Sequence, residues 1–393
     1  MPMLPINTPK IYLDYAASTP LDPRVLDAML PHFKSNHGNS SSVHTFGQKA
    51  ESAVETSRRA IAELINCTPS EIIFTACGSE SDNLALQGRA LAARQETGAN
   101  HILISPVEHH AISHTAELLG ARFGFELEYL PVDSFGRVSP EDVAARLRKE
   151  TAVVSVIYAN NEIGTINPIS AIGEICREHG IAFHTDAVQA AAHLPIDTQT
   201  LNADLISIGA HKFYGPKGVG ALYIRGGVTL QPLFGGGAQE YGLRPGTANV
   251  PYIAGMAEAF KLSNQERSQT NSRLSGWRDK IIQGILENIP DAKLTGHSTD
   301  RLPNLASFVF KGVDGNELLI LLDQNGFACS SGSACKTGNP EPSEVLTAVG
   351  LDQEWALGSL RVSLGKPTTE QEVDQFLAAM PGLISSQRVL ETL

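Results

Sequence analysis

Two charged residues near the middle of the chain have the types and positions that carbonyl chemistry needs. Lys212 follows the β-rich run DLISIGA, and burial at a strand end would lower its pKa, as imine formation with an aldehyde requires. Asp186 ends the run FHTD, where a buried carboxylate needs a cationic partner such as a protonated pyridine nitrogen. The alternative roles are a solvated surface lysine and an aspartate that caps a helix.

Smaller polar groups follow three other β-rich runs. Gly78 and Ser79 begin a helical pattern, where free N–H groups and a hydroxyl can hold a phosphate, although ordinary helix capping fits the same residues. His109 and His110 lack a third ligand at metal spacing, so they predict no metal site and favour a ring stacked on an aromatic ligand or a structural histidine. Asn161, in YANNEIG, is either a turn residue or a donor to a substrate carboxylate.

A glycine-, serine- and proline-rich segment near the C-terminus, FACSSGSACKTGNPEPSEVL, carries two cysteines. Lys336 directly follows Cys335, and a neighbouring cation favours the thiolate form of a cysteine. A loop of this composition also suits a nucleophile that must reach a bound substrate and then deliver its cargo. Cys335 is therefore the candidate nucleophile, with an incidental exposed thiol as the alternative, whereas Cys329 ends a β-rich run and is expected to pack in the interior.

The elements that must position these residues follow from hydrophobic patterning. Amphipathic helical stretches alternate with the β-rich runs EIIFTA, HILIS, FELEYLPV, AVVSVIYA, GIAFHTDA, DLISIGA and GALYI, which predicts a mainly parallel sheet covered by helices on both faces. Ligands of such sheets bind at the carboxyl ends of the strands. After Pro251 the pattern becomes that of a smaller α+β domain. We expect a large α/β domain at 14–260 and a small C-terminal domain at 261–393, to which segment 1–13 belongs.

Length and composition limit the class of protein. The 393 residues suggest two or three domains, and 42% hydrophobic residues can bury a sizeable core. The formal net charge of −12 disfavours nucleic acid and an anionic membrane surface as partners. No membrane-spanning run or targeting segment is visible, and five cysteines without a CxxC pair predict free thiols in a cytoplasmic protein.

The order of these motifs resembles that of the class V aminotransferase family, which consists of fold type I pyridoxal 5′-phosphate (PLP) enzymes, and specifically its cysteine desulfurases. The segment AHKFYGPKG is a fairly specific match. The other matching segments, spread over about residues 10–380, are YLDYAASTP, FTACGSESDNLA, EHHA, NNEIG, HTDAVQ, RPGT, SSGSAC and LRVSLG.

The resemblance implies that the chain binds PLP through these motifs. Lys212 would form an imine with the cofactor and later move the proton at the substrate α-carbon, and Asp186 would keep the pyridine nitrogen protonated. Gln189 would hydrogen-bond the phenolate oxygen, and His109, also a catalytic residue in the family, would stack on the ring. The residues implied in phosphate binding are Gly78, Ser79 and His211.

The same resemblance implies L-cysteine as the substrate. Arg361 would bind the substrate carboxylate through two parallel hydrogen bonds, supported by Asn161 and Asn39. Cys335 would attack the substrate sulfur, which yields L-alanine and a persulfide for a sulfur-acceptor or scaffold protein in iron–sulfur cluster assembly or thiolation. Thr247 would reach the phosphate bound by a neighbouring subunit, which implies a homodimer.

Two positions depart from the family pattern. Gly209-Ala210 replaces the usual Ser-Gly and removes a hydroxyl donor to the phosphate, and Cys77, expected to be a packing residue, stands where another small residue is usual. Three other functions stay open. A selenocysteine lyase shares the fold and cofactor, an aminotransferase would use Lys212 without Cys335, and a non-catalytic scaffold for sulfur acceptors would need neither.

Overall fold

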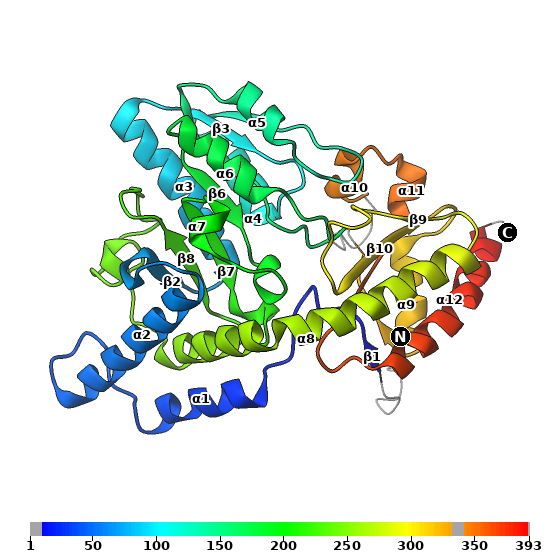
Figure 1. Cartoon of the computed structure of the whole chain (residues 1–393), viewed down its shortest axis with the longest axis horizontal. Helices are drawn as coiled ribbons and strands as arrows, with labels where there is room; N and C mark the ends of the chain where they lie inside the picture. The colour runs from blue at the N-terminus through cyan, green and yellow to red at the C-terminus, as the bar shows by residue number, and fades with distance from the viewer. Residues whose placement is uncertain (1–9, 332–341, 392–393) are drawn as a thin grey trace.

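A seven-stranded sheet forms the centre of the larger part of the molecule (Figure 1). The computed structural model describes residues 10–331 and 342–391. The strand order is β2-β8-β7-β6-β5-β3-β4, and all neighbours are parallel except that β8 is antiparallel to β2 and β7. The strands are β2 (Ile72–Thr75), β3 (His101–Ile104), β4 (Glu126–Tyr129), β5 (Thr151–Ser155), β6 (Phe183–Asp186), β7 (Leu205–Gly209) and β8 (Gly220–Ile224). Each coincides with or overlaps a predicted run, so the mainly parallel sheet is confirmed.

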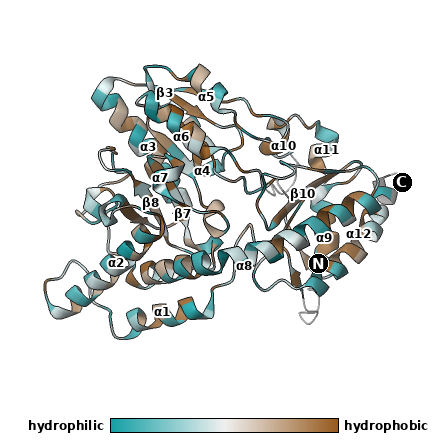
Figure 2. Cartoon of the chain, viewed as in Figure 1, coloured by the Kyte–Doolittle hydropathy of each residue, from teal (hydrophilic) through white to brown (hydrophobic). Residues whose placement is uncertain are grey.

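Helices cover both faces of this sheet because successive strand residues point to opposite sides. Ile72 and Phe74 belong to one apolar core and Ile73 to another, and Val154 and Val153 divide in the same way. One face packs against α2 (Thr45–Leu64), α6 (Ile169–Glu178) and the first part of α8 (Val250–Asn288), and the other against α3 (Gly78–Thr97) and α4 (His110–Phe123). Figure 2 shows this as hydrophobic strands surrounded by helices of mixed hydropathy.

A second apolar core lies beside a three-stranded antiparallel sheet in the order β12-β10-β9. The elements around this core are β9 (Ala292–Leu294), β10 (Leu305–Phe310), α9 (Gly315–Gln324), β12 (Ser359–Ser363) and α12 (Glu370–Glu391). Strand β1 (Ile11–Tyr12) pairs in parallel with β11 (Phe327–Ala328), and Leu13 after it belongs to the same core. Residues 11–13 therefore pack with the C-terminal part of the chain.

Helix α8 connects the two cores. Phe260 is buried in the first core and Leu274 in the second, so the expected boundary at 260/261 falls inside one continuous helix and stays a prediction. The remaining α-helices are α1 (Pro23–Lys34), α5 (Pro140–Arg146), α7 (Thr198–Leu201), α10 (Glu344–Ala348) and α11 (Gln353–Leu357). Within residues 10–331 and 342–391, no helix has both the length and the apolar character needed to cross a bilayer.

Candidate active site

A cavity of about 440 Å³ lies at the carboxyl ends of β5, β6 and β7, where Arg361 of β12 also reaches it. Parallel strands end at one edge of a sheet, so residues that are far apart in sequence meet there. The cavity collects nine of the site residues that the sequence analysis named, which are Gly78, Ser79, His109, Asn161, Asp186, Gln189, His211, Lys212 and Arg361.

Lys212 follows β7 in a short 3₁₀ turn, and its ammonium group meets the N-terminal segment. Nζ donates hydrogen bonds to the carbonyl oxygens of Ala16 at 2.5 Å and Ala17 at 2.9 Å. Burial, and then the positive charge of Arg361, lower the pKa of Lys212 to about 8, against the opposing charge of Asp186. At neutral pH a larger share of Lys212 is therefore uncharged than of an ordinary lysine.

Asp186 ends β6 as a buried carboxylate with only one backbone contact at its side chain. Oδ1 accepts a hydrogen bond from the Val188 N–H at 2.8 Å, and within the described residues no cation lies at ion-pair distance from it. Burial raises the pKa of Asp186, although the charges of His109 and Lys212 oppose this. Beside it, Oε1 of Gln189 is buried without a hydrogen-bond partner in the described part of the chain. Both side chains therefore suit a polar, cationic ligand group.

The first turn of α3 borders the cavity with Gly78 and Ser79, whose backbone N–H groups have no partner inside the helix. Cys77 is the N-cap residue, and its Sγ accepts a hydrogen bond from the N–H of Glu80 at 3.4 Å. A Cβ at Gly78 would lie 2.6 Å from Cγ2 of Val188, so only glycine fits there. A Cβ at Gly209 would lie 3.5 Å from the nitrogen of Gly78, which is where the hydroxyl-bearing side chain of the family pattern would sit.

Cys77 corrects one expectation from the sequence. It is only partly buried and lines the cavity, whereas the sequence analysis expected a buried packing residue. Cys77 lies between the end of β2 and the start of α3, as the N-cap of that helix. A cap residue lies outside the helix, so Cys77 borders the cavity and is not packed in the interior. A thiol in this chain therefore faces the region that the family pattern assigns to phosphate binding.

Two histidines that border the cavity are neutral, His211 and His109. Burial, and then the charge of Lys212, lower the pKa of His211 to about 4, so this ring is neutral at physiological pH. His109 is the N-cap of α4, and its Nδ1 accepts a hydrogen bond from the N–H of Ala111 at 3.1 Å. The neutral His109 ring therefore carries its hydrogen on Nε2.

Arg361 is buried in β12 and is held from two sides. Nη2 pairs with Oδ1 of Asp14 at 2.8 Å, and Nη1 donates to the backbone carbonyl of Asn161 at 2.9 Å. Its Nε is buried without a hydrogen-bond partner among the described residues. The guanidinium group is thus held in a fixed orientation at the edge of the cavity, which suits a substrate carboxylate. Asp14 lies in the motif YLDYAASTP, but no feature of the sequence predicts its contact with Arg361.

Two buried acids close to Asp186 also escaped the sequence analysis. Asp82 of α3 lines the cavity, and Glu108 accepts a hydrogen bond from the N–H of Ile157 at 2.6 Å. Burial raises the pKa of both acids, to about 8 for Glu108, and the charge of Asp186 adds to this. The three acids are therefore not ionised together. The only sequence signal for them was that Asp82 lies in the matching segment ESDN and Glu108 in the matching segment EHHA.

Three predicted site residues do not line the cavity. Asn39 is exposed, and its Oδ1 accepts a hydrogen bond from the N–H of Ser41 at 2.9 Å. Thr247 is exposed and borders a separate cavity with Arg244 and Gly246. Cys335 lies outside the described residues. The roles expected for these three residues stay predictions.

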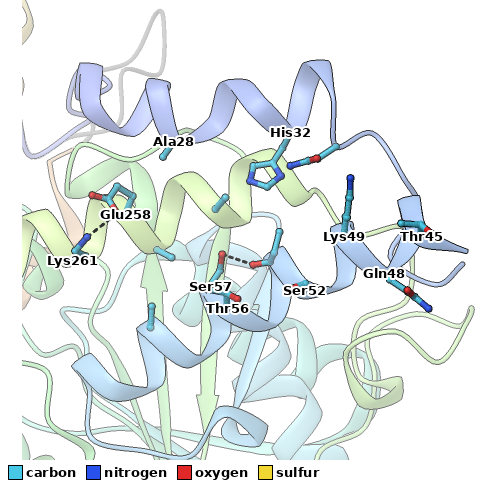
Figure 3. Close-up of a pocket in the computed structure, with 15 residues that line it drawn as sticks. Ala28, His32, Thr45, Gln48, Lys49, Ser52, Thr56, Ser57, Glu258 and Lys261 are labelled. Carbon is cyan, nitrogen blue, oxygen red and sulfur yellow. Dashed lines mark hydrogen bonds and ion pairs between the residues drawn. The ribbon is translucent and has the colours of Figure 1, made fainter. Parts of the chain in front are cut away.

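A larger cavity of about 720 Å³ lies between α1, α2 and α8 and contains none of the predicted site residues. Figure 3 shows His32 of α1 and Lys49 of α2 at this cavity, with Lys261 and Glu258 of α8 paired at its edge. Most of its lining is alanine, serine and threonine. Size alone therefore does not mark the reactive site of this molecule, whereas the convergence of perturbed ionisable groups does.

Comparisons with known proteins agree with this geometry. The aminotransferase class-V family profile matches residues 11–376. The chain is 47% identical over 386 residues to cysteine desulfurase IscS of Clostridium botulinum, which covers 98% of this chain and 96% of that protein. Among solved structures, a NifS-like protein superposes with a TM-score of 0.89 at 36% identity and covers 96% of this chain and 100% of its own. SspA in complex with cysteine superposes with a TM-score of 0.78 at 36% identity, and the match covers 90% of this chain and 98% of SspA. This chain belongs to the aminotransferase class-V family, in the group that includes the cysteine desulfurases.

Proposed function

We propose that this protein is a PLP-dependent cysteine desulfurase. It removes sulfur from L-cysteine, releases L-alanine and carries the sulfur as a persulfide on Cys335 for transfer to an acceptor or scaffold protein in iron–sulfur cluster assembly or thiolation. The observation that carries the proposal is the meeting of Lys212, Asp186 and Arg361 at one cavity. A lysine of lowered pKa, a buried carboxylate and an oriented guanidinium group together match an amino acid bound to a pyridine aldehyde.

The residues at the cavity fit PLP. The Asp186 carboxylate suits the protonated ring nitrogen, and the Nε2–H₂ group of Gln189, at the same cavity, can donate to the phenolate oxygen. Gly78 allows Val188 to pack closely against the start of α3, and the N–H groups of that first turn, together with Ser79 and the neutral His211, would hold the phosphate. The ring of His109 would stack on the pyridine ring. The missing hydroxyl at Gly209 removes one phosphate contact.

PLP supplies an electron sink that stabilises negative charge at the substrate α-carbon. The side chains of this protein orient the substrate and move the proton at its α-carbon. With a pKa of about 8, Lys212 can take a proton from the α-carbon and return it at neutral pH. Arg361, held by Asp14, orients the substrate through its carboxylate.

Cys335 performs the sulfur transfer in this proposal. Its thiolate attacks the substrate sulfur, a sulfur–sulfur bond forms and the carbon–sulfur bond breaks. The bond electrons stay with the carbon skeleton, which takes up a proton and leaves as alanine. The enzyme retains the sulfur as a persulfide, and a second thiol or an acceptor protein removes it.

Intact-protein mass spectrometry after incubation with L-cysteine tests the function directly. We expect the intact protein to gain the mass of one or more sulfur atoms, which digestion then assigns to the peptide that contains Cys335, together with alanine in the solution. Keto-acid-dependent amino transfer without added sulfur would identify an aminotransferase. Turnover of selenocysteine with strict rejection of cysteine would identify a selenocysteine lyase, and a protein that binds no PLP would be a scaffold.

Replacing Arg361 with lysine should weaken substrate binding more than chemistry. A lysine keeps the charge but loses the planar fork that Asp14 orients, and a charged hydrogen bond contributes ~1.5–3 kcal/mol. We therefore expect KM for L-cysteine to rise by ~10–100-fold while kcat falls less. Steady-state alanine production measures both constants. Arg273→Lys, a change of an arginine outside the cavity, is the control, and an unchanged KM in Arg361→Lys would contradict the assigned role.

We also propose that the active species is a homodimer in which Thr247 completes the phosphate site of the other subunit. Thr247 is exposed and does not line the cavity of its own chain, as this role requires. Large apolar side chains that a second subunit would cover are also exposed, with Val43 at 90%, Tyr241 at 60% and Phe46 at 54%.

Mixed dimers test the contribution of Thr247. Lys212→Ala and Thr247→Val chains, each impaired alone at limiting PLP, should regain activity when they are unfolded and refolded together. The mixed dimer then contains one site with Lys212 from one chain and Thr247 from the other, both intact. Activity of the mixture is compared with that of each variant refolded by itself. If Thr247 serves its own chain, no intact site forms and no activity returns.

A further inference from the structure

Helix α4 and helix α10 bring two histidines and a glutamate together outside the candidate active site. His110 and His114 are four residues apart on α4, and Glu344 is the first residue of α10. The ligand atoms of the three side chains all lie within 4.8 Å of one another, and all three residues are exposed. In the described part of the chain, none of these side chains has a hydrogen bond or ion pair.

The backbone holds these side chains in place. Residues four apart share one face of a helix, and the two rings lie 4.5 Å apart between their centroids. His109 caps the start of α4. Ser343 caps α10 through the N–H groups of Val345 and Leu346 and donates a hydrogen bond to Glu162. Both helix ends are therefore fixed, and the side chains alone need to adjust.

We propose that His110, His114 and Glu344 bind a divalent transition-metal ion of the zinc type that links α4 to α10. Two imidazoles and one carboxylate are a common ligand set for zinc and related ions, but not for magnesium or calcium. Two ligands of one tetrahedral zinc ion lie ~3.4 Å apart, so the exposed side chains need to move by only ~1 Å. A water or another ligand would occupy the fourth position.

This site differs from what the sequence predicts. The adjacent pair His109 and His110 has no third ligand, and His109 instead faces the cavity. The fold supplies the missing ligands from the next turn of α4 and from a helix 230 residues further along the chain. A bound ion would add a connection between the element that carries His109 and the end of the segment that carries Cys335.

Calorimetric titration of the PLP-loaded protein with Zn²⁺ tests the proposal. The titration is done in Cys335→Ser protein without an affinity tag, because a free thiol binds the same metals. We expect one Zn²⁺ per chain, and a weakening of at least ~10-fold in His114→Ala and in Glu344→Gln, since even loss of an outer-shell partner of a metal ligand costs ~10–100-fold. Titration with Mg²⁺ should give no binding at this site.

His179→Ala is the matched control, because His179 is an exposed histidine at the end of α6 and should not alter the affinity. Saturating Zn²⁺ should also raise Tm in the parent and in His179→Ala, but not in the two ligand variants. The proposal is overturned if no stoichiometric binding occurs, or if the affinity is the same in His114→Ala and the parent. Loss of affinity in His114→Ala with none in Glu344→Gln would equally overturn it, because α10 would then contribute no ligand.

Discussion

Replacing Lys212 with alanine should lower desulfurase turnover by ~10⁴-fold or more, because one change removes both the covalent attachment to PLP and the group that moves the α-proton. General acid–base catalysis alone contributes ~10²–10⁴-fold. The substitution should leave the fold intact. It deletes two hydrogen bonds to Ala16 and Ala17, but it also removes a cation from a buried position.

Alanine production from L-cysteine measures the loss of turnover, and the visible absorbance of the purified protein reports whether PLP is covalently held. Lys217→Ala is the matched control, since Lys217 is an exposed lysine in the turn that follows. It should retain turnover within a few-fold and keep the absorbance band. Full turnover in Lys212→Ala would show that another residue holds the cofactor.

Replacing Cys335 with serine should lower alanine and sulfide release by more than ~10³-fold while PLP stays bound. A hydroxyl is a far poorer nucleophile than a thiolate at neutral pH, and the proposed reaction has no other group to receive the sulfur. The turnover of selenocysteine should fall less with the same substitution, because selenium leaves the carbon skeleton more easily. Turnover of both substrates, measured beside the PLP absorbance, separates the loss of sulfur transfer from loss of the cofactor.

Cys329→Ser is the control for this experiment. Cys329 is partly buried next to β11, and burial raises the pKa of its thiol, so it is a poor source of thiolate. Its replacement should change turnover by no more than a few-fold. The opposite order, with Cys329→Ser inactive and Cys335→Ser close to the parent, would place the nucleophile at Cys329 and leave the cofactor site unchanged.

The strands, and the polar residues that line the cavity at their carboxyl ends, could be predicted because their signals are local. Strands buried on both faces are nearly continuous apolar runs, as in VVS of β5 and LISI of β7, and the polar residues after them stand out. Helices α1 and α2 were not assigned from the sequence. Both helices have apolar residues at helical spacing, but they precede β2 and therefore lie outside the alternation of strands and helices from which the other elements were predicted.

The sequence by itself therefore determined the family, the sheet and the residue types available for chemistry, since motif order and hydrophobic period are properties of neighbouring residues. Only the tertiary structure decided which of these residues meet. Asp14 reaches Arg361 across 347 positions, and Lys212 reaches Ala16 across 196. The same holds for Glu344 beside His114. Such contacts arise because strand edges and helix ends from distant segments converge in space, and no local pattern encodes that convergence.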